Sequence, residues 1–425
     1  MPSAIVVGGG LAGISAAAAL GDAGFSVQLF EARPYLGGRA TSYRISPDSE
    51  PIDNCQHVLL ACFTNLLNLY ERLGVAGRIA FHREFHFIEP GGRRSVLRAG
   101  PLPAPAHLMG SLFRLAFLDA ADKLAVSRAV ASVNSEWRRG DLDSITMLDW
   151  LNEKRQPPRA VERFWKQVLV SAINEDLGRM AARHGLQVIR TGFLSSRKAY
   201  RMGLATVPLA ELYGNVRLRG VDVRCGRRVD RISEAGVVTG EGEHRADYYV
   251  LAVPFERAQA LAPDLQLRTD AFEHSPITGI HLWFAEPVMD LPHATLLDRT
   301  IHWAFNKRGG RYIQLVVSAS RALIAMPRSE VIALAVRELA EFFPKAGRVA
   351  LERAHVVKEL HATFSARPGM EALRPPAKAE IPNVFLAGDW TRTGWPATME
   401  GAVRSGYLAA EAVTAAAGAA RRFVV

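Results

Sequence analysis

The feature that most constrains this chain is a glycine-rich turn between an apolar segment and an alanine-rich segment near its N-terminus. Residues 4–7 (AIVV) precede Gly8, Gly10 and Gly13, which have the G-x-G-x-x-G spacing. The first glycine of this motif permits a tight turn, the second lets the backbone approach a pyrophosphate, and the third lets the following helix pack closely on the sheet. Free N–H groups at the start of that helix favour an anion. The motif therefore predicts a βαβ unit that binds a dinucleotide.

An acidic residue and a second pair of glycines follow this unit. Residues 26–30 (SVQLF) predict a second strand, and Glu31 stands at its end. A carboxylate at this distance from the glycine motif is suited to hold an adenosine ribose. Gly37 and Gly38 let a second loop approach the same ligand, and the planar guanidinium of Arg39 can offset pyrophosphate charge.

Another glycine motif lies near the C-terminus. The segment NVFLAGDW contains Gly388 and Asp389, and Met399-Glu400-Gly401 opens a stretch with helical spacing. A flavin dinucleotide spans more of a protein than one loop can hold. Two motifs at opposite ends of the chain therefore indicate FAD rather than a smaller ligand.

The pattern between these motifs predicts an α/β fold with two regions. Helical spacing dominates from about residue 84 to 205, and strand-like segments return at 205–260. A last strand and helix are expected within 383–413. We predict a discontinuous FAD-binding domain with a mixed α+β substrate domain inserted into it. The predicted ranges are 1–83, 205–265 and 380–425 for the FAD-binding domain, and 84–204 and 266–379 for the substrate domain.

Composition narrows the class of partner. A chain of 425 residues with 49% hydrophobic and 22% charged residues has globular values and favours two domains. The formal net charge of +10 favours anionic partners. Because zinc-ligand spacing, an aromatic RNA-binding motif and basic repeats are missing from the sequence, we expect neither a nucleic-acid partner nor a metal site.

The cysteines and the N-terminus bear on the compartment. Cys55, Cys62 and Cys225 are too few for a disulfide framework, so a reducing, cytoplasmic location is expected. The N-terminal apolar run is interrupted by glycines and predicts a strand, a turn and a helix rather than a signal peptide. Beyond it, no apolar run of about 18 residues predicts a membrane span.

These motifs resemble those of the large family of flavin-dependent amine oxidases and carotenoid-type desaturases. The resemblance covers most of the chain and is sharpest at residues 4–65 and 383–413. It implies a Rossmann-like FAD-binding domain of the GR2 type, in which the final helix points its N-terminus at the flavin ring. It also implies non-covalent FAD, because no cysteine lies near the C-terminal motif. The implied cofactor-binding residues are Gly8, Gly10, Leu11, Ala12, Gly13, Glu31, Ala32, Gly37, Gly38, Arg39, Val229, Gly388, Asp389, Thr398, Met399 and Glu400.

A narrower resemblance rests on the segment DNCQHVLL at residues 53–60, with companions at 102–117, 170–175 and 393–406. This set is similar to the hydroxysqualene dehydroxylases of squalene and hopanoid biosynthesis. The resemblance implies an FAD-dependent oxidoreductase that removes the hydroxyl of hydroxysqualene, a C30 isoprenoid, to give squalene. Reduced flavin would supply the hydride, and water would be lost. The chain departs from this branch at Asn174-Glu175, where Asn-Thr is expected, so the resemblance does not fix the exact lining of the substrate pocket.

Such a reaction requires a general acid, because a hydroxyl leaves poorly unless it is protonated. It also requires an apolar tunnel that keeps water from an allylic cation. Asp53 and His57 are the first candidates for the acid or its support, because their segment should reach the flavin, and Glu175 is the third. The alternatives are a hydrogen-bonded core histidine for His57 and a backbone-capping carboxylate for Asp53.

The segment 101–131 is the candidate for membrane contact. Arg114, Lys123 and Arg128 lie among apolar residues at helical spacing. A water-insoluble substrate enters from a bilayer, so an interfacial helix and peripheral association with the inner face of the cytoplasmic membrane are expected. The alternative is a buried helix of the substrate domain. The apolar residues are Leu108, Met109, Leu112, Phe113, Leu115, Phe117 and Leu118.

Three other functions stay open at this point. An oxidative desaturase of a C30 or C40 polyene would share every cofactor motif and differ only in redox direction. An amine oxidase would need an aromatic pair facing the flavin, for which Trp390 and Trp395 are the candidates. A scaffold stabilised by FAD would bind flavin without turnover. The electron donor, NAD(P)H or a reductase, is also open, because no second dinucleotide motif is visible.

Overall fold

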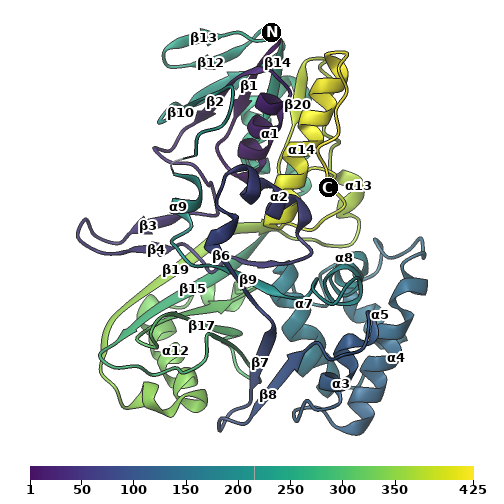
Figure 1. Ribbon diagram of the computed structural model, residues 1–425, viewed down its shortest axis with the longest axis vertical. Helices are drawn as coiled ribbons and strands as arrows, with labels where there is room; N and C mark the ends of the chain where they lie inside the picture. Colours follow the sequence, from purple (N-terminus) through teal and green to yellow (C-terminus); the bar gives the residue numbers. More distant parts are fainter. Residues whose placement is uncertain (215) are drawn as a thin grey trace.

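The computed structural model describes residues 1–214 and 216–425. Figure 1 shows an upper lobe that holds both chain termini and a wider lower part made of a sheet on one side and helices on the other. The upper lobe is built on a five-stranded parallel sheet of order β10-β2-β1-β14-β20. Its strands are β1 Ser3–Val7, β2 Ser26–Glu31, β10 Val221–Cys225, β14 Tyr248–Leu251 and β20 Val384–Leu386. All three predicted FAD-binding stretches thus contribute strands to one sheet.

Two helices pack together beside this sheet: α1 Leu11–Asp22 and α14 Met399–Ala416. They cross closely, because a Cβ added at Gly406 would stand 2.1 Å from the Ala12 carbonyl oxygen. The Ser15 hydroxyl donates to the Val403 carbonyl across the contact at 3.1 Å. Small residues at the crossing therefore let the first and last helices of the chain pack as one layer on the central strands.

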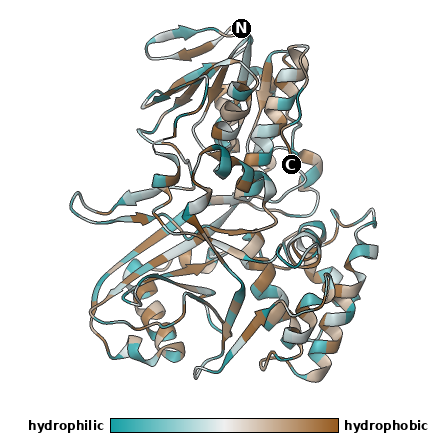
Figure 2. Ribbon diagram, viewed as in Figure 1, coloured by the Kyte–Doolittle hydropathy of each residue, from teal (hydrophilic) through white to brown (hydrophobic). Residues whose placement is uncertain are grey.

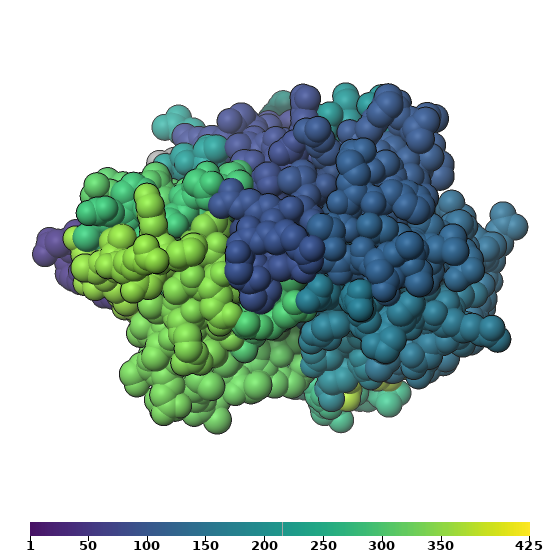
Figure 3. Space-filling view, turned by 90° about the horizontal axis from the view of Figure 1, so that it is seen from below, coloured from purple at the N-terminus to yellow at the C-terminus, as the bar shows by residue number. Residues whose placement is uncertain are grey.

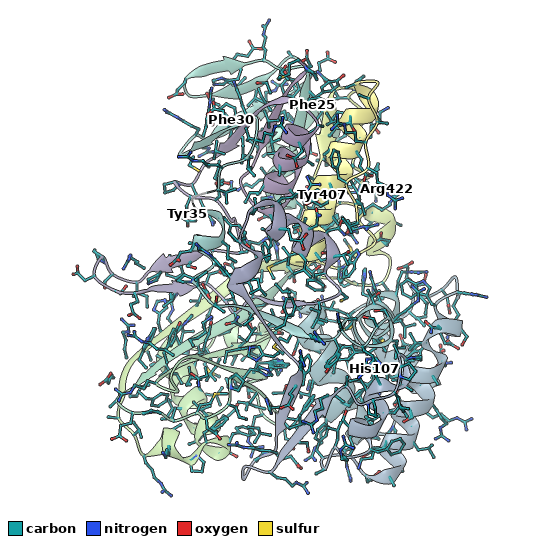
Figure 4. The ribbon with its side chains drawn as sticks, in the orientation of Figure 1. Phe25, Phe30, Tyr35, His107, Tyr407 and Arg422 are labelled. Atoms are coloured by element: carbon teal, nitrogen blue, oxygen red, sulfur yellow. The ribbon has the colours of Figure 1, made fainter. Side chains whose placement is uncertain are left out.

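Smaller strands and helices complete the upper lobe and its junction. Phe25, just before β2, Phe30 of β2 and Tyr407 of α14 lie within this lobe (Figure 4). Strand β9 Met202–Ala205 pairs with β5 and β6, so the chain near the predicted boundary at 204 returns to the N-terminal stretch. The further elements are β3 Ser42–Arg44, β4 Pro51–Asp53, β5 Val58–Leu60, α2 Thr64–Arg72, η1 Ala76–Arg78, β6 Ile79–His82, α9 Ala210–Tyr213, β11 Val229–Ile232, β12 Val237–Thr239, β13 Gly242–His244, α10 Phe255–Leu261, η5 Pro263–Leu265 and η6 Thr269–Ala271.

A seven-stranded mixed sheet of order β19-β15-β18-β17-β16-β7-β8 forms one side of the lower part. One face packs on α12 Arg328–Phe342 through alternate apolar residues such as Leu282, Ala304 and Leu315. The opposite face carries Trp303, Phe305 and Val316. The elements are β7 Glu84–Ile88, β8 Arg94–Arg98, β15 His274–Phe284, β16 His293–Leu296, β17 Trp303–Arg308, β18 Tyr312–Val317, α11 Arg321–Ile324, α12, η7 Pro344–Gly347, β19 Leu351–Phe364 and α13 Met370–Leu373.

Helices form the other side of the lower part. Strands β7 and β8 (dark blue in Figure 3) lie between the sheet region in green and the helices in blue. Capping boxes begin α4, with Asp119 and Asp122, and α5, with Thr146 and Asp149, so both helix starts are encoded locally. The elements are η2 Ala106–Leu108, α3 Met109–Leu112, α4 Ala120–Glu136, α5 Met147–Glu153, α6 Pro158–Ala160, the π-helix η3 Val161–Trp165, α7 Lys166–Ile173, α8 Ala182–Gln187 and the π-helix η4 Val188–Leu194.

The segment 101–131 is more buried than its pattern predicts. Leu112, Leu115, Phe117 and Leu118 belong to the main apolar core, and His107 is 1% exposed among the helices (Figure 4). Its exposed large apolar side chains are reduced to three: Leu102, Phe113 and Leu124. The prediction of a broad apolar surface is therefore wrong, because short helices turn most of these side chains inward.

Apolar residues also run along the strands of both sheets, as Figure 2 shows. In the part of the chain that the structure describes, no helix is long and apolar enough to cross a bilayer.

Candidate active site

A single cavity of about 870 Å³ runs from the glycine motifs of the upper lobe into the lower part. The predicted cofactor residues meet along its upper end, although they come from three distant stretches of the chain. Those that line it are Gly8, Gly10, Leu11, Ala12, Glu31, Ala32, Gly37, Gly38, Arg39, Val229, Gly388, Asp389, Thr398 and Met399.

Two glycine loops form a cradle at this end. Gly8 has φ +111°, and a Cβ there would stand 2.4 Å from the Ala252 carbonyl oxygen. Gly38 has φ +61°, and its Cβ would stand 3.0 Å from the Gly10 Cα. Both positions need glycine for backbone conformation and for space. Because the two loops touch through bare backbone, their N–H groups can surround a pyrophosphate.

Gly13 and Glu400 do not line the cavity. A Cβ at Gly13 would stand 1.8 Å from the Gly8 carbonyl oxygen, so this glycine acts through the close helix–strand packing that the motif predicts. The buried Glu400 carboxylate instead accepts hydrogen bonds from the backbone N–H groups of Asn65 and Leu66, at the start of α2. Its side chain therefore fixes α2 onto α14 and is directed away from the cofactor end.

Charged groups border the same end. Arg39 donates to the Asp389 carboxylate at 2.6 Å and to the Ala362 carbonyl at 3.0 Å. Burial alone would lower the pKa of Arg39, but the charge of Asp389 outweighs it and raises the pKa. Glu31 accepts from the Gly9 N–H at 2.6 Å, which ties the strand end to the glycine loop. The guanidinium is therefore a permanent cation beside the cradle.

These residues fit FAD. A pyrophosphate and a ribose require four groups, and all of them are present at this end. They are the positive N-terminus of a helix at Leu11, a backbone cradle that a Cβ would obstruct, a fixed cation and an acid at a strand end. The N-terminus of α14 begins with Thr398, whose hydroxyl accepts from the Gly401 N–H at 3.0 Å. Thr398 and Met399 face the same cavity, so this second helix N-terminus can stabilise charge on a flavin ring.

Of the three acid candidates, only His57 lines the cavity. Its Nδ1 lies 2.9 Å from the Cys55 carbonyl oxygen. Because a carbonyl only accepts, Nδ1 carries the proton and Nε2 is the atom left to titrate. Burial lowers the pKa of His57 below its ordinary value, against the raising effect of that hydrogen bond. His57 is therefore predominantly neutral at pH 7, with one exchangeable ring nitrogen.

Asp53 lies behind the cavity wall. Its carboxylate accepts from Ser42 at 2.7 Å, from the Leu209 N–H at 3.0 Å and from Lys307 at 3.1 Å. Burial would raise the pKa of Asp53, but Lys307 and the two hydrogen bonds outweigh it and lower the pKa. A carboxylate held in its charged form cannot donate a proton, so Asp53 matches its alternative prediction, a backbone-capping acid.

Glu175 also lies outside the cavity lining. The buried carboxylate forms a two-point pair with Arg321, both contacts at 2.7 Å, and accepts from Ser365. Burial would raise the pKa of Glu175, but Arg321 and Ser365 outweigh it and lower the pKa. Glu175, which stands where the resemblance predicts threonine, therefore joins the end of α7 to α11 and to the end of β19. The preceding Asn174 does line the cavity.

The lower end of the cavity is mainly aromatic and aliphatic. Phe85, Phe87, Leu97, Trp303 and Phe305 line it from β7, β8 and β17. Few polar side chains interrupt this surface: Gln167 is more than nine-tenths buried, and Ser171 accepts from Trp303 Nε1 at 2.7 Å. Sequence reasoning missed these residues. The strand alternation at 276–320 was the available signal for Trp303 and Phe305, and Phe85 and Phe87 lie outside that range.

The two tryptophans considered for an amine cage are separated. Trp395 lines the cavity and packs edge-on against Phe63, with ring centroids 5.6 Å apart. Trp390 is 1% exposed and donates from Nε1 to the Val253 carbonyl at 2.9 Å. The predicted aromatic pair is therefore not formed by these two residues.

Comparisons with known proteins agree with this geometry. A hydroxysqualene dehydroxylase from Rhodopseudomonas palustris is 31% identical over 432 residues, covering 97% of this chain and 98% of that protein. A probable zeta-carotene desaturase from Synechococcus elongatus is 27% identical over 473 residues, covering 96% and 98%. Among solved structures, a putrescine oxidase has a TM-score of 0.71 at 16% identity, covering 97% of this chain and all of that one, which shows the shared fold.

The family profile described as flavin containing amine oxidoreductase matches residues 11–414. This range includes the second glycine loop and most of the cavity lining and of α14. The cofactor is a flavin, in agreement with the cradle built for FAD. The chain belongs to the flavin-containing amine oxidoreductase family and is an FAD-dependent oxidoreductase.

Proposed function

We propose that this protein reductively removes the hydroxyl of hydroxysqualene to give squalene. The observation that carries the proposal is one cavity that joins an FAD cradle to an aromatic chamber, with His57 in its wall. The relatives named hydroxysqualene dehydroxylase support the choice of substrate. FAD would be held without a covalent bond by the cradle, Arg39 and the N-terminus of α14.

Each part of the cavity has a chemical task in this reaction. The FAD cradle would hold reduced flavin, which would supply a hydride to the carbon that loses its oxygen. Protonated His57 donates its Nε2 proton to the hydroxyl, so that water rather than hydroxide leaves. The Cys55 carbonyl holds the ring orientation. Phe85, Trp303 and Phe305 hold the isoprenoid chain and keep water from the carbon while it is cationic. In the overall reaction, the alcohol, a hydride and a proton are converted to the hydrocarbon and water.

The test is a single turnover of anaerobically reduced protein with hydroxysqualene in detergent. Flavin reoxidation and squalene formation are expected, and His57→Gln should slow both by about 10²- to 10⁴-fold. Because the acid form is required and burial lowers the His57 pKa, the wild-type rate should rise as pH falls and level off only below the lowered pKa, at a pH under about 6.5. His361→Gln is a matched control, since His361 also lines the cavity. An unchanged rate in His57→Gln with full FAD occupancy would rule out this role.

An oxidative desaturase of a C30 or C40 polyene is the second candidate. The desaturase relatives favour it, and an aromatic chamber also suits a polyene. Mixing oxidised protein with an isoprenoid polyene that still contains saturated C–C bonds separates the two, because this function predicts flavin reduction and a new double bond. Squalene formed from hydroxysqualene by reduced protein would decide for the dehydroxylase.

We also propose peripheral binding to an anionic membrane surface through the segment 101–131. Leu102 and Phe113 are 51% and 52% exposed, and Arg114 and Arg128 are exposed in the same segment. Partly inserted apolar side chains with cations beside them are suited to a headgroup layer. This surface is smaller than a full amphipathic helix, so weak and reversible binding is expected.

A further inference from the structure

Two histidines and a glutamate meet where a helix that follows the parallel sheet reaches two strands of the seven-stranded sheet. Glu256 is at the start of α10, His274 begins β15, and His361 lies near the end of β19. His274 Nε2 lies 3.8 Å from Glu256 Oε2, and His361 Nδ1 lies 4.0 Å from Glu256 Oε1. One ligand atom from each side chain lies within 4.8 Å of the other two. One carboxylate therefore faces two imidazoles, each through its own oxygen.

Packing holds the two imidazoles beside each other. His274 stacks on His361, with ring centroids 4.1 Å apart and planes at 22°, and on Phe255, at 4.5 Å and 26°. Both histidines lie on paired neighbouring strands, β15 and β19. The backbone of Thr363 acts on the His274 ring as a hydrogen-bond partner. Backbone contacts of this kind commonly orient a metal-binding histidine, so the two rings are arranged before any ion binds.

The separations suit a shared metal ion better than direct hydrogen bonds. At 3.8 and 4.0 Å, both histidine nitrogens are beyond hydrogen-bond reach of the Glu256 carboxylate, which ends near about 3.2 Å. Two atoms that each lie about 2.0–2.2 Å from one ion can be up to about 4.4 Å apart, so both pairs fit around a single ion. Mg²⁺ and Ca²⁺ prefer oxygen ligands throughout, whereas imidazoles with a carboxylate suit Zn²⁺ and its neighbours.

Access and charge also favour a cation here. The side chain of His361 is 58% exposed, and the other two ligands are partly exposed, so an ion can enter from solvent. Arg39 is the nearby cation that would repel it, but Arg39 is paired with Asp389 at 2.6 Å. Glu256 and Glu359 both attract Arg39 as well, and both line the cavity. Three carboxylates thus face one guanidinium, which leaves the surroundings negative.

We propose that Glu256, His274 and His361 bind one Zn²⁺-like ion, with water as its fourth ligand. The ion would join α10 to β15 and β19, and so fasten the cofactor lobe to the substrate sheet. A metal site was not expected from the sequence, because its ligands come from three separate segments whose spacing matches no metal motif. The site is independent of the substrate that the protein converts.

The experiment titrates FAD-loaded protein, stripped of metal with EDTA and dialysed, with Co²⁺. Tetrahedral Co²⁺ absorbs in the red, where oxidised flavin does not. One Co²⁺ per chain should bind, and Zn²⁺ should displace it whereas excess Mg²⁺ should not. Glu256→Gln, His274→Gln and His361→Gln should each weaken Zn²⁺ binding by at least about 100-fold, because even outer partners of metal ligands account for about 10- to 100-fold.

His86→Gln is the matched control. His86 Nε2 also lies near a carboxylate, 3.9 Å from Glu84 Oε2, but within residues 1–214 and 216–425 no third ligand atom lies within 4.8 Å of both. This variant should keep the wild-type affinity. Zn²⁺ should also raise the thermal unfolding midpoint of wild type and His86→Gln, but not of His361→Gln. Absence of the red Co²⁺ absorption, wild-type affinity in the three ligand variants, or binding only after FAD is removed would overturn the inference.

The outcomes are separate from those of the proposed function. Metal binding without squalene formation would leave this inference intact, and squalene formation without metal binding would remove the inference alone. Assays of the role of His57 are run with EDTA, which keeps this site empty in every sample. FAD occupancy measured for each ligand variant shows whether the cofactor end is intact.

Discussion

The two ends of the cavity are built in different ways. At the cofactor end, backbone meets backbone: Gly38 touches Gly10, and Gly13 stands against the Gly8 carbonyl. At the substrate end, side chains from β7, β8, α7 and β17 meet across the lower part of the molecule. The first end has no room for a Cβ at Gly8, Gly13 or Gly38, whereas the second is a side-chain surface that tolerates changes of similar volume. We therefore expect cofactor binding to fail abruptly on substitution and substrate selection to shift by degrees.

The largest effect is expected at Gly13. Alanine in a helix is ordinarily more stable than glycine by about 1 kcal/mol, so Gly13→Ala would stabilise an uncrowded helix. Here the new Cβ would stand 1.8 Å from the Gly8 carbonyl oxygen, and the strand–helix turn must move. We expect purified Gly13→Ala to contain little or no FAD, measured from the flavin-to-protein absorbance ratio.

Gly140→Ala is the control for this prediction, because a Cβ at Gly140 meets nothing within 4 Å. It should keep full FAD occupancy. Full occupancy in Gly13→Ala would instead show that the cradle tolerates displacement, and the contrast between the two ends of the cavity would be lost.

The next largest effect is expected from Glu175, which supports the substrate end from behind. Glu175→Gln removes the charge that faces Arg321 in a fully buried position. Breaking a buried pair costs about 3–5 kcal/mol, and the lower end applies because Arg321 is 34% exposed and regains water. Urea denaturation should show the loss. Glu162→Gln, in the exposed pair with Lys166, should cost less than about 0.5 kcal/mol, and equal losses would contradict a structural role for Glu175.

The same contrast explains how far the sequence could be interpreted. At the cofactor end, each requirement is local: glycine where φ is positive, an acid at a strand end, and threonine before a helix. Residue type and spacing are therefore enough to identify Gly8, Glu31, Gly38 and Thr398 in the sequence. All four line one cavity. The parallel sheet that gathers them from three stretches follows from the same βαβ pattern.

At the substrate end, no local rule applies. Whether an acid faces a cavity or a cation depends on strands distant in the chain, and Asp53 meets Lys307 only through the folded sheet. Glu175 likewise meets Arg321, which lies 146 residues later in the chain. The apolar residues of 101–131 predicted a surface, but short helices buried most of them. Three-dimensional packing, rather than residue type, decides these roles.

Asp53 should have a smaller, pH-dependent effect. Its pKa is lowered in the folded protein, so its stabilisation is present above the unfolded value near 3.8 and is lost as pH falls toward the folded value. Asp53→Asn should reduce the free energy of unfolding by about 2 kcal/mol at pH 7, the size of hydrogen bonds to a charged group. Urea titrations at pH 7 and pH 3 should show the difference from wild type shrinking at pH 3. A difference that does not change with pH would mean that the charge of Asp53 is not what stabilises the segment.

The smallest effect is expected at the surface. Phe113 is 52% exposed, and burying about half of a phenylalanine side chain in a headgroup layer contributes about 1 kcal/mol. Phe113→Ser should therefore lower the fraction that floats with anionic vesicles about fivefold, with no change in FAD content. Phe81→Ser is the control, because Phe81 is 40% exposed on β6, outside the segment 101–131. If both variants float like the wild type, this segment does not contact the membrane, and the isoprenoid must reach the aromatic chamber by another route.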